Sequence, residues 1–216
     1  MLAWDDFDTL FLDLDGTLLD LAFDNRFWRT RVPEAYAKAR GLDVEAARET
    51  LVPMFRSCEG TLDWYCVEYW TRTLQVDIVA LKEAMASEVA WLPGARQFLE
   101  HARARGKRLV LLTNAHPQTL KIKDRRTGVV ELLDRAHSSH HFGAPKEHGR
   151  FWSALGEVET FDPARTLFVD DSLTVLHAAR AAGLSHVRAV RRPDTSRPER
   201  EIEGFDSVSG VASLFA

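Results

Sequence analysis

The fold is decided near the N-terminus by the stretch Thr9-Leu10-Phe11-Leu12-Asp13-Leu14-Asp15-Gly16-Thr17-Leu18. Its apolar run, residues 10–12, is typical of a short strand that is buried on both faces of a parallel sheet. The run leads into Asp13 and Asp15, which would share one face of a continuing strand. Open α/β sheets bind their ligands at the carboxyl ends of their strands, so we expect both carboxylates at a ligand-binding edge.

Two neighbouring carboxylates at a buried edge require compensation of their charge. Burying like charges is costly without a cation or a hydrogen-bond network. Asp-x-Asp pairs are also common in solvated loops, but the full string through Gly16, Thr17 and Leu18 is far more specific. The sequence therefore indicates a divalent metal between Asp13 and Asp15, or a proton that they share.

The composition is that of a globular protein of one sizeable domain, or of a core with a small insert. The chain has 216 residues, of which 45% are hydrophobic and 28% charged, and its net charge is −4. This acidic balance argues against nucleic acid as a main partner, because binding to a phosphate backbone needs a basic face. We also expect no signal peptide, no membrane association and a cytoplasmic location, because the N-terminus is acidic and no apolar run approaches roughly 18 residues.

Residues 21–89 contain no convincing strand and are predicted to form a helical insert. Helices are expected at residues 33–40, from residue 44 until Pro53 ends or kinks the helix, at 61–74 and at 77–88. This pattern predicts a bundle of about four helices. The insert is rich in aromatic residues, among them Trp28, Tyr36, Trp64, Tyr65 and Trp70. Cys58 and Cys66 fit a reduced cytosolic protein, and we interpret both as small apolar residues on helices rather than metal ligands.

Strands and helices alternate from residue 92 onward. Strands are expected at residues 108–113, 135–138, 165–169 and 187–190, and helices at 95–105, 117–127, 149–155, 172–182 and 208–215. Such alternation implies parallel strands joined by right-handed crossovers. We therefore predict a doubly wound parallel α/β sheet built from residues 1–20 and 90–216, with the insert at residues 21–89 following the first strand.

Polar side chains also follow the second predicted strand, where Thr113 and Asn114 end it. The hydroxyl and the neighbouring backbone N–H groups could hold phosphate oxygens, although a Thr-Asn pair is equally typical of a turn. Lys146 follows a Gly-Ala-Pro segment, where a lysine is usually a solvated loop residue. Beside a carboxylate site it could instead neutralise a phosphoryl group during transfer.

Asp170 and Asp171 end a later predicted strand and precede Ser172. They bring the number of carboxylates expected at this sheet edge to four, with Asp13 and Asp15. Such an oxygen-rich site favours Mg²⁺.

In their order and spacing these segments resemble the haloacid dehalogenase (HAD) superfamily of phosphotransferases across essentially the whole chain. The matching motifs are residues 13–17, 113–114, 146 and 170–172, and the insert stands where that superfamily places its C1 cap. The resemblance implies that Asp13 attacks phosphorus to form an aspartyl-phosphate, while Asp15 protonates the leaving group and then activates water.

The same resemblance implies a Mg²⁺ cofactor. Its ligands would be the Asp13 carboxylate, the Asp15 backbone carbonyl and Asp171, with Asp170 beside them. Asp171 is favoured over Asp170 because the family's usual form of this motif is Gly-Asp-Ser or Glu-Asp-Ser. The second carboxylate of the first motif, Asp15, argues against dehalogenation, whose leaving group needs no proton.

Longer strings at residues 61–66, 69–70, 113–117, 138–147 and 168–172 resemble the bacterial GMP/IMP nucleotidase group. This resemblance implies a small phosphorylated substrate, specifically a purine 5′-nucleotide. The alternatives are a phosphatase of phosphoglycolate or a sugar phosphate, a phosphomutase, and a regulatory binding protein on a HAD scaffold. Candidate contacts for a base are five residues of the insert: Phe23, Trp28, Arg56, Trp64 and Tyr65.

Two further clusters are interpreted without a functional role. His137, His140 and His141 are expected to be ordinary loop histidines, since no matching cysteine or carboxylate spacing lies nearby. The basic residues on the predicted helix at 117–127 are expected to form a solvated face, with steering of phosphate as the lesser alternative. They are Lys121, Lys123, Arg125 and Arg126.

Overall fold

The computed structural model describes residues 2–214, in which six parallel strands form one sheet in the order β3-β2-β1-β4-β5-β6. The strands are β1 (Thr9–Leu12), β2 (Arg108–Thr113), β3 (Arg135–Ser138), β4 (Thr166–Asp170), β5 (His186–Val190) and β6 (Ser207–Val208). In the central strand β1, Leu10 lies in register with Leu109 on one side and Leu167 on the other. The strand order reverses at β1, which is the position where doubly wound sheets bind ligands.

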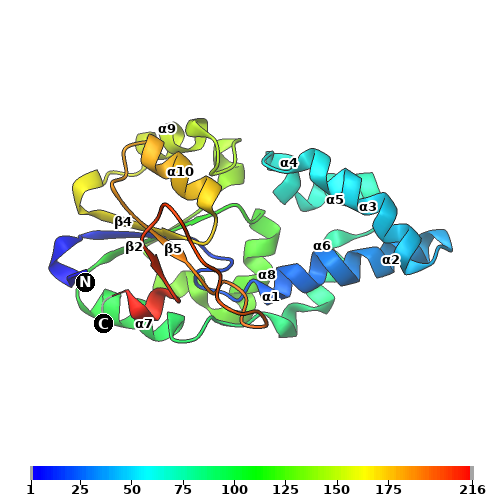
Figure 1. The fold of residues 1–216 in the computed structure, drawn as a ribbon, viewed down its shortest axis with the longest axis horizontal. Helices are drawn as coiled ribbons and strands as arrows, with labels where there is room; N and C mark the ends of the chain where they lie inside the picture. The colour runs from blue at the N-terminus through cyan, green and yellow to red at the C-terminus, as the bar shows by residue number, and fades with distance from the viewer. Residues whose placement is uncertain (1, 215–216) are drawn as a thin grey trace.

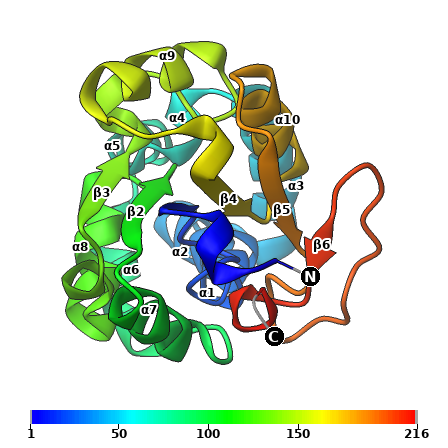
Figure 2. The same cartoon turned by 90° about the vertical axis from the view of Figure 1, so that its left-hand side faces the viewer.

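Helices cover both faces of the sheet, as Figure 2 shows. Helices α9 (Gly149–Val158) and α10 (Leu173–Ala181) pack on one face, and α7 (Ala95–Ala104) packs on the other. Successive strand residues alternate between the faces: Phe11 contacts the α9 and α10 side, whereas Leu10 and Leu12 contact the α7 side. The predicted doubly wound parallel α/β sheet is confirmed.

The chain between β1 and α7 is largely helical and extends away from the sheet beyond the carboxyl ends of the strands (Figure 1). We call residues 22–88 the helical insert. Its elements are α1 (Ala22–Arg26), the π-helical turn η2 (Phe27–Arg31), α2 (Val32–Arg40), α3 (Val44–Cys58), α4 (Leu62–Tyr65), α5 (Val67–Leu74), α6 (Ile78–Ala84) and η3 (Ala86–Glu88). One apolar cluster runs from Leu12 in the sheet through Phe27 to Trp70 in the insert. Its burial fixes the insert against the α7 side of the sheet.

The insert differs from its prediction at three places. It is helical from Ala22 and holds more helices than the four expected. Pro53 does not end helix α3, which continues to Cys58, because burial of Leu51 and Cys58 on one face outweighs the single hydrogen bond that proline removes. The helix expected at residues 61–74 is broken at Cys66, whose backbone is extended and whose sulfur accepts a hydrogen bond from the N–H of Tyr69. The apolar periodicity continues across this break and therefore hides it.

The prediction of a helix at residues 208–215 is wrong for residues 208–214, and residue 215 lies outside the part of the chain that the structure describes. Ser207 and Val208 instead pair with β5 as the short edge strand β6. The 3₁₀ turn η7 (Val211–Ser213) follows, and it packs against α7 with Val211 and Leu214 buried. No helix among the described residues is long and apolar enough to cross a membrane.

Candidate active site

The structure brings all the predicted site residues to one cavity of about 410 Å³ at the carboxyl ends of β1, β2 and β4. Helix α8 (Pro117–Thr127) begins beside it and contacts α6 of the insert. The site residues among its lining are Asp13, Asp15, Thr113, Asn114, Lys146, Asp170 and Asp171. Its volume lies in the range of pockets that bind small molecules, roughly 300–1,000 Å³.

Lys146 is the cation at the centre of this cavity. Its Nζ lies 2.5 Å from Asp13 Oδ1 and 2.7 Å from Asp170 Oδ2, and it donates a hydrogen bond to the Leu112 carbonyl at 2.8 Å. The residue is only 1% exposed, so it is not the solvated lysine that a Gly-Ala-Pro segment usually precedes. Burial acts to lower the pKa of Lys146, but Asp13 and Asp170 raise it above its ordinary value. The ammonium group is therefore held charged between two carboxylates.

Three carboxylates meet beside this lysine. Asp13, Asp170 and Asp171 each place an oxygen within 4.8 Å of the others. Burial, against the opposing charge of Lys146, raises the pKa of Asp13 to about 7. Burial and the charges of Asp170 and Asp13 raise the pKa of Asp171 well above its ordinary value. The cluster thus lacks positive charge, and its oxygen donors fit a hard divalent cation such as Mg²⁺.

The two aspartates at the end of β4 differ in how free their carboxylate oxygens are to bind a cation. Both oxygens of Asp170 already accept hydrogen bonds, one from Lys146 and one from the backbone N–H of Ser172 at 2.8 Å. The Asp171 carboxylate has Arg200 as its ion-pair partner at 3.9 Å. Asp171 is therefore the freer of the two to bind a cation.

Gly16 is required where the chain turns after β1. Its φ is +88°, and a Cβ there would lie 2.8 Å from Asp171 Cγ and 2.8 Å from Pro193 Cβ. A side chain at this position would push the Asp171 carboxylate away from Asp13. The glycine of the Asp-x-Asp-Gly string thus allows the carboxylates to converge.

Asp15 is held by a second buried lysine. Lys123 Nζ on α8 lies 2.5 Å from Asp15 Oδ1 and 2.5 Å from Asp24 Oδ2, and Lys82 Nζ lies 2.8 Å from Asp24 Oδ1. Burial raises the pKa of Asp15 to about 6, although Lys123 acts to lower it. Lys123 is 1% exposed, so its assignment to a solvated helix face is wrong.

Sequence reasoning missed Lys123, Asp24 and Lys82. For Lys123 a signal existed, because it lies four residues from both Thr119 and Thr127, which are buried on the same face of α8. The exposed side chains of this basic segment are Lys121, Arg125 and Arg126.

The Asn114 side chain holds the loop that carries Lys146 in place through two hydrogen bonds. Its Oδ1 accepts the backbone N–H of Lys146 at 2.9 Å, and its Nδ2 donates to Glu147 Oε2 at 2.9 Å. Tyr65 of the insert donates its hydroxyl hydrogen bond to Glu147 Oε1 at 2.5 Å. The Thr113 hydroxyl accepts from the Ala115 N–H at 3.0 Å, which leaves its own proton available to a phosphoryl oxygen.

The outer part of the cavity is formed by the insert. Of the five candidate base contacts, Trp28, Trp64 and Tyr65 line the cavity. Phe23 is buried in the apolar cluster and Arg56 is exposed, and neither is among the lining residues. Phe55 and Arg29, which the sequence did not single out, do line it.

Comparison with known proteins gives a consistent result. Residues 7–183 match the family model of haloacid dehalogenase-like hydrolases. The chain is 40% identical over 213 residues to the GMP/IMP nucleotidase YrfG of Escherichia coli, covering 99% of this chain and 96% of that protein. It is 31% identical to a phosphoglycolate phosphatase of Nitrosospira multiformis, covering 94% of this chain and 91% of that protein.

Among solved structures, the HAD phosphatase of Thermococcus onnurineus matches with a TM-score of 0.81 at 20% identity, covering 96% of both chains. The magnesium-bound HAD hydrolase YfnB of Bacillus subtilis matches with a TM-score of 0.69 at 18% identity, covering 96% of both chains. At these identities the two structures support the fold alone. From its family match and its full-length relatives, the chain belongs to the haloacid dehalogenase-like hydrolases and groups with the phosphatases of that family.

Proposed function

We propose that the protein is a Mg²⁺-dependent phosphomonoesterase that hydrolyses purine nucleoside 5′-monophosphates, GMP and IMP, through an aspartyl-phosphate (an acyl phosphate) on Asp13. One observation carries this proposal: a single cavity contains Asp13, Asp15 and Lys146 together with the aromatic side chains of Trp28 and Trp64. The 40% identity to a GMP/IMP nucleotidase supports the choice of substrate.

In this mechanism an oxygen of ionised Asp13 attacks the phosphorus of the substrate, and the bond to the nucleoside 5′-oxygen breaks. Lys146 fixes the orientation of Asp13 through its 2.5 Å contact and offsets the negative charge that develops. Asp15, with its pKa raised to about 6 by burial, gives its proton to the departing oxygen. It then takes a proton from the water that attacks the phosphorus, which releases phosphate and restores Asp13.

The residues proposed to hold Mg²⁺ are the carboxylates of Asp13 and Asp171 and the backbone carbonyl of Asp15, with Asp170 beside them. When bound, the ion supplies positive charge to the phosphoryl oxygens and to the carboxylate cluster. Thr113 and the backbone N–H groups around Asn114 are proposed to bind the phosphoryl oxygens.

We further propose that residues 21–89 act as a cap over a core of residues 1–20 and 90–216. The support is that insert side chains line the cavity over the strand ends, and that Tyr65 bonds to Glu147 beside Lys146. A purine ring could stack on Trp28 or Trp64, since these aromatic faces lie at the outer part of the cavity.

A phosphate-release assay over a panel of substrates tests the proposal. The panel contains GMP, IMP, AMP, pyrimidine nucleotides, phosphoglycolate and sugar phosphates, each with Mg²⁺ and with EDTA, and Asp13→Asn is the control for contaminating phosphatase. We expect the highest kcat/KM for GMP and IMP and no turnover in EDTA. Preference for phosphoglycolate would leave a phosphatase but refute the nucleotidase proposal, and tight binding of nucleotides without turnover would indicate a regulatory binding protein.

A further inference from the structure

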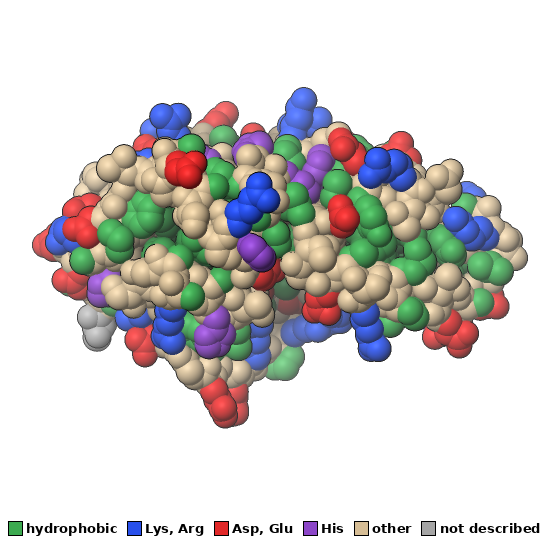
Figure 3. Space-filling model, turned by 90° about the horizontal axis from the view of Figure 1, so that it is seen from above, with side chains coloured by type: hydrophobic (Ala, Val, Ile, Leu, Met, Phe, Trp, Pro, Cys, Tyr) green, Lys and Arg blue, Asp and Glu red, His purple; other side chains and the backbone are tan. Residues whose placement is uncertain are grey.

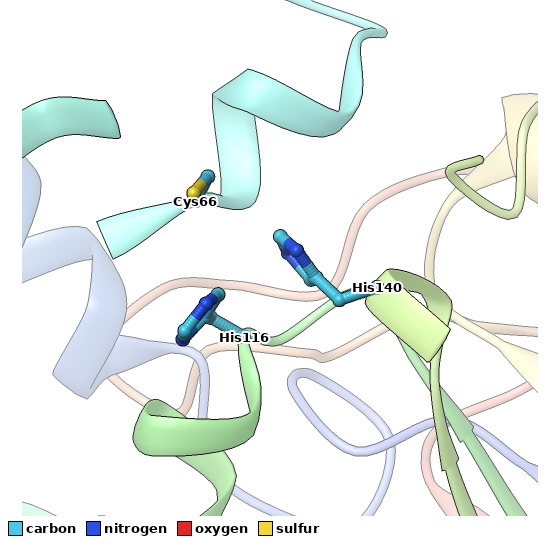
Figure 4. Close-up of side chains that lie close together, drawn as sticks. All are labelled: Cys66, His116 and His140. Carbon is cyan, nitrogen blue, oxygen red and sulfur yellow. The ribbon is translucent and has the colours of Figure 1, made fainter. Parts of the chain in front are cut away.

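A group of metal-ligating side chains lies outside the acidic site, where the helical insert meets the core. Cys66, His116 and His140 each place one ligand atom within 4.8 Å of the others, and Figure 4 shows the side chains gathered around a common space. Cys66 lies between α4 and α5 of the insert, His116 precedes α8, and His140 belongs to the 3₁₀ turn η5 (Ser139–Phe142). Histidine side chains are also visible near this boundary on the surface (Figure 3).

We propose that Cys66, His116 and His140 form a second metal site, for Zn²⁺ or a divalent cation of similar softness, which ties the helical insert to the core. One thiolate and two imidazoles are the ligands that zinc prefers, whereas Mg²⁺ prefers the oxygens of the acidic site. The three protein ligands leave a fourth tetrahedral position for water. This proposal does not depend on the phosphatase substrate.

The surroundings of the His140 ring favour the interpretation of His140 as a metal ligand over that of an ordinary loop histidine. Its Nε2 is buried and has no hydrogen-bond partner among the described residues. Burial, together with His116 and His141, lowers the pKa of His140 to about 4, so the ring is neutral at neutral pH. A buried ring nitrogen is costly to leave without a partner, and a metal ion bound there would satisfy it.

The other two ligands are also suited to this role. His116 is buried, and its burial lowers the pKa of the ring, which disfavours the charged form. The break between α4 and α5 brings Cys66 out of a continuous helix and sets it beside the two rings. The other histidines of the sequence cluster are placed differently: His137 bonds to Glu159 at 2.6 Å, and His141 is exposed.

A metal bound at this site would link the insert directly to the core. Ligand atoms around a tetrahedral zinc lie about 3.5 Å apart, given Zn–S and Zn–N bonds of about 2.3 and 2.0 Å. The ligand atoms of Cys66, His116 and His140 already lie within 4.8 Å of one another, so a bound metal would hold these three segments at a fixed, short spacing. His116 also lines the substrate cavity, so the bound metal would hold the insert in place at the mouth of that cavity.

Cobalt is the probe for the site, since a thiolate ligand gives bound Co²⁺ a charge-transfer band that oxygen ligands do not. Co²⁺ is titrated into the protein with Mg²⁺ in excess to occupy the acidic site. We expect one equivalent of Co²⁺ to produce the thiolate band in the wild type and in the control variant Cys58→Ser. The band should be absent in Cys66→Ser, and His140→Gln should weaken binding at least tenfold. Serine preserves the helix cap of α5, so loss of the band in Cys66→Ser does not reflect unfolding.

The link between insert and core is measured by hydrogen–deuterium exchange of residues 62–74 with and without Zn²⁺. We expect Zn²⁺ to slow exchange there in the wild type and in Cys58→Ser but not in Cys66→Ser. A wild type without the thiolate band, or a band that persists in Cys66→Ser, overturns the site. Equal slowing of exchange in Cys66→Ser and wild type overturns the proposed tie between insert and core.

Discussion

Replacing Lys123 by methionine should destabilise the protein far more than replacing Arg125, two residues further along the same helix, by methionine. Lys123→Met leaves Asp15 without its cation, while Asp24 retains Lys82 at 2.8 Å. Breaking a buried ion pair costs about 3–5 kcal/mol. The Asp15 side chain is 21% exposed, so we expect the lower end, about 3 kcal/mol. For a chain of this size that is a fall in Tm of roughly 6–12 °C.

The matched control is Arg125→Met. Arg125 lies on the same helix as Lys123, and its replacement removes an ion pair with Glu83 of α6. These side chains are 52% and 42% exposed, and exposed pairs contribute only about 0–1 kcal/mol. Both variants are compared with the wild type by urea unfolding at pH 7. Adding Asp15→Asn to Lys123→Met removes the unpaired charge and should restore at least about 1 kcal/mol. If the two single variants lose the same stability, the buried ion-pair reasoning is refuted.

The remaining predictions concern the carboxylates and Lys146. Asp13→Asn should abolish turnover and the formation of any covalent phosphate. Asp15→Asn should lower turnover of GMP by about 10²–10⁴-fold. With acetyl phosphate, Asp15→Asn should nevertheless accumulate phosphate on Asp13, which acid quench and mass spectrometry detect. Lys146→Ala should lower both kcat/KM and Tm, because this lysine is 1% exposed and pairs with two aspartates; an unchanged Tm would contradict this. Burial acts to raise the pKa of Glu159, but Arg108 and His137 lower it overall. Its stabilising effect, about 1.5–3 kcal/mol, is therefore present above the ordinary pKa and lost as pH falls through the lowered one. Glu159→Gln and wild type should therefore differ in unfolding free energy at pH 7 and converge once the pH falls below the lowered pKa.

The strands and the inner site were predictable because each depends on local sequence. The apolar runs that form β1, β2 and β4 are each followed by polar residues, and parallel strands bring those residues to one edge. Asp13, Thr113 and Asp170 therefore converge with only the strand order left to be found.

Contacts between side chains that are far apart in the chain could not be predicted from the sequence. Lys123 lies 108 positions from Asp15, and on its own helix it stands among basic residues that are exposed. Cys66, His116 and His140 come from three segments with no common spacing pattern, and the break at Cys66 interrupts an apolar repeat that continues through it. Edge strand β6 is two residues long, too short for any periodicity to indicate it.

The balance of charge at the sheet edge supports the divalent cation of the proposed reaction. The buried network contains five carboxylates and three lysines: Asp13, Asp15, Asp24, Asp170, Asp171, Lys82, Lys123 and Lys146. With all eight groups ionised, two negative charges remain, or one when the more exposed Arg200 beside Asp171 is counted, and a phosphate dianion would add two more. Lysines pair with every one of these carboxylates except Asp171, whose ion-pair partner among the described residues is Arg200 at 3.9 Å. The missing positive charge is therefore localised at Asp171, beside the nucleophile, where a cation would also meet the incoming phosphate.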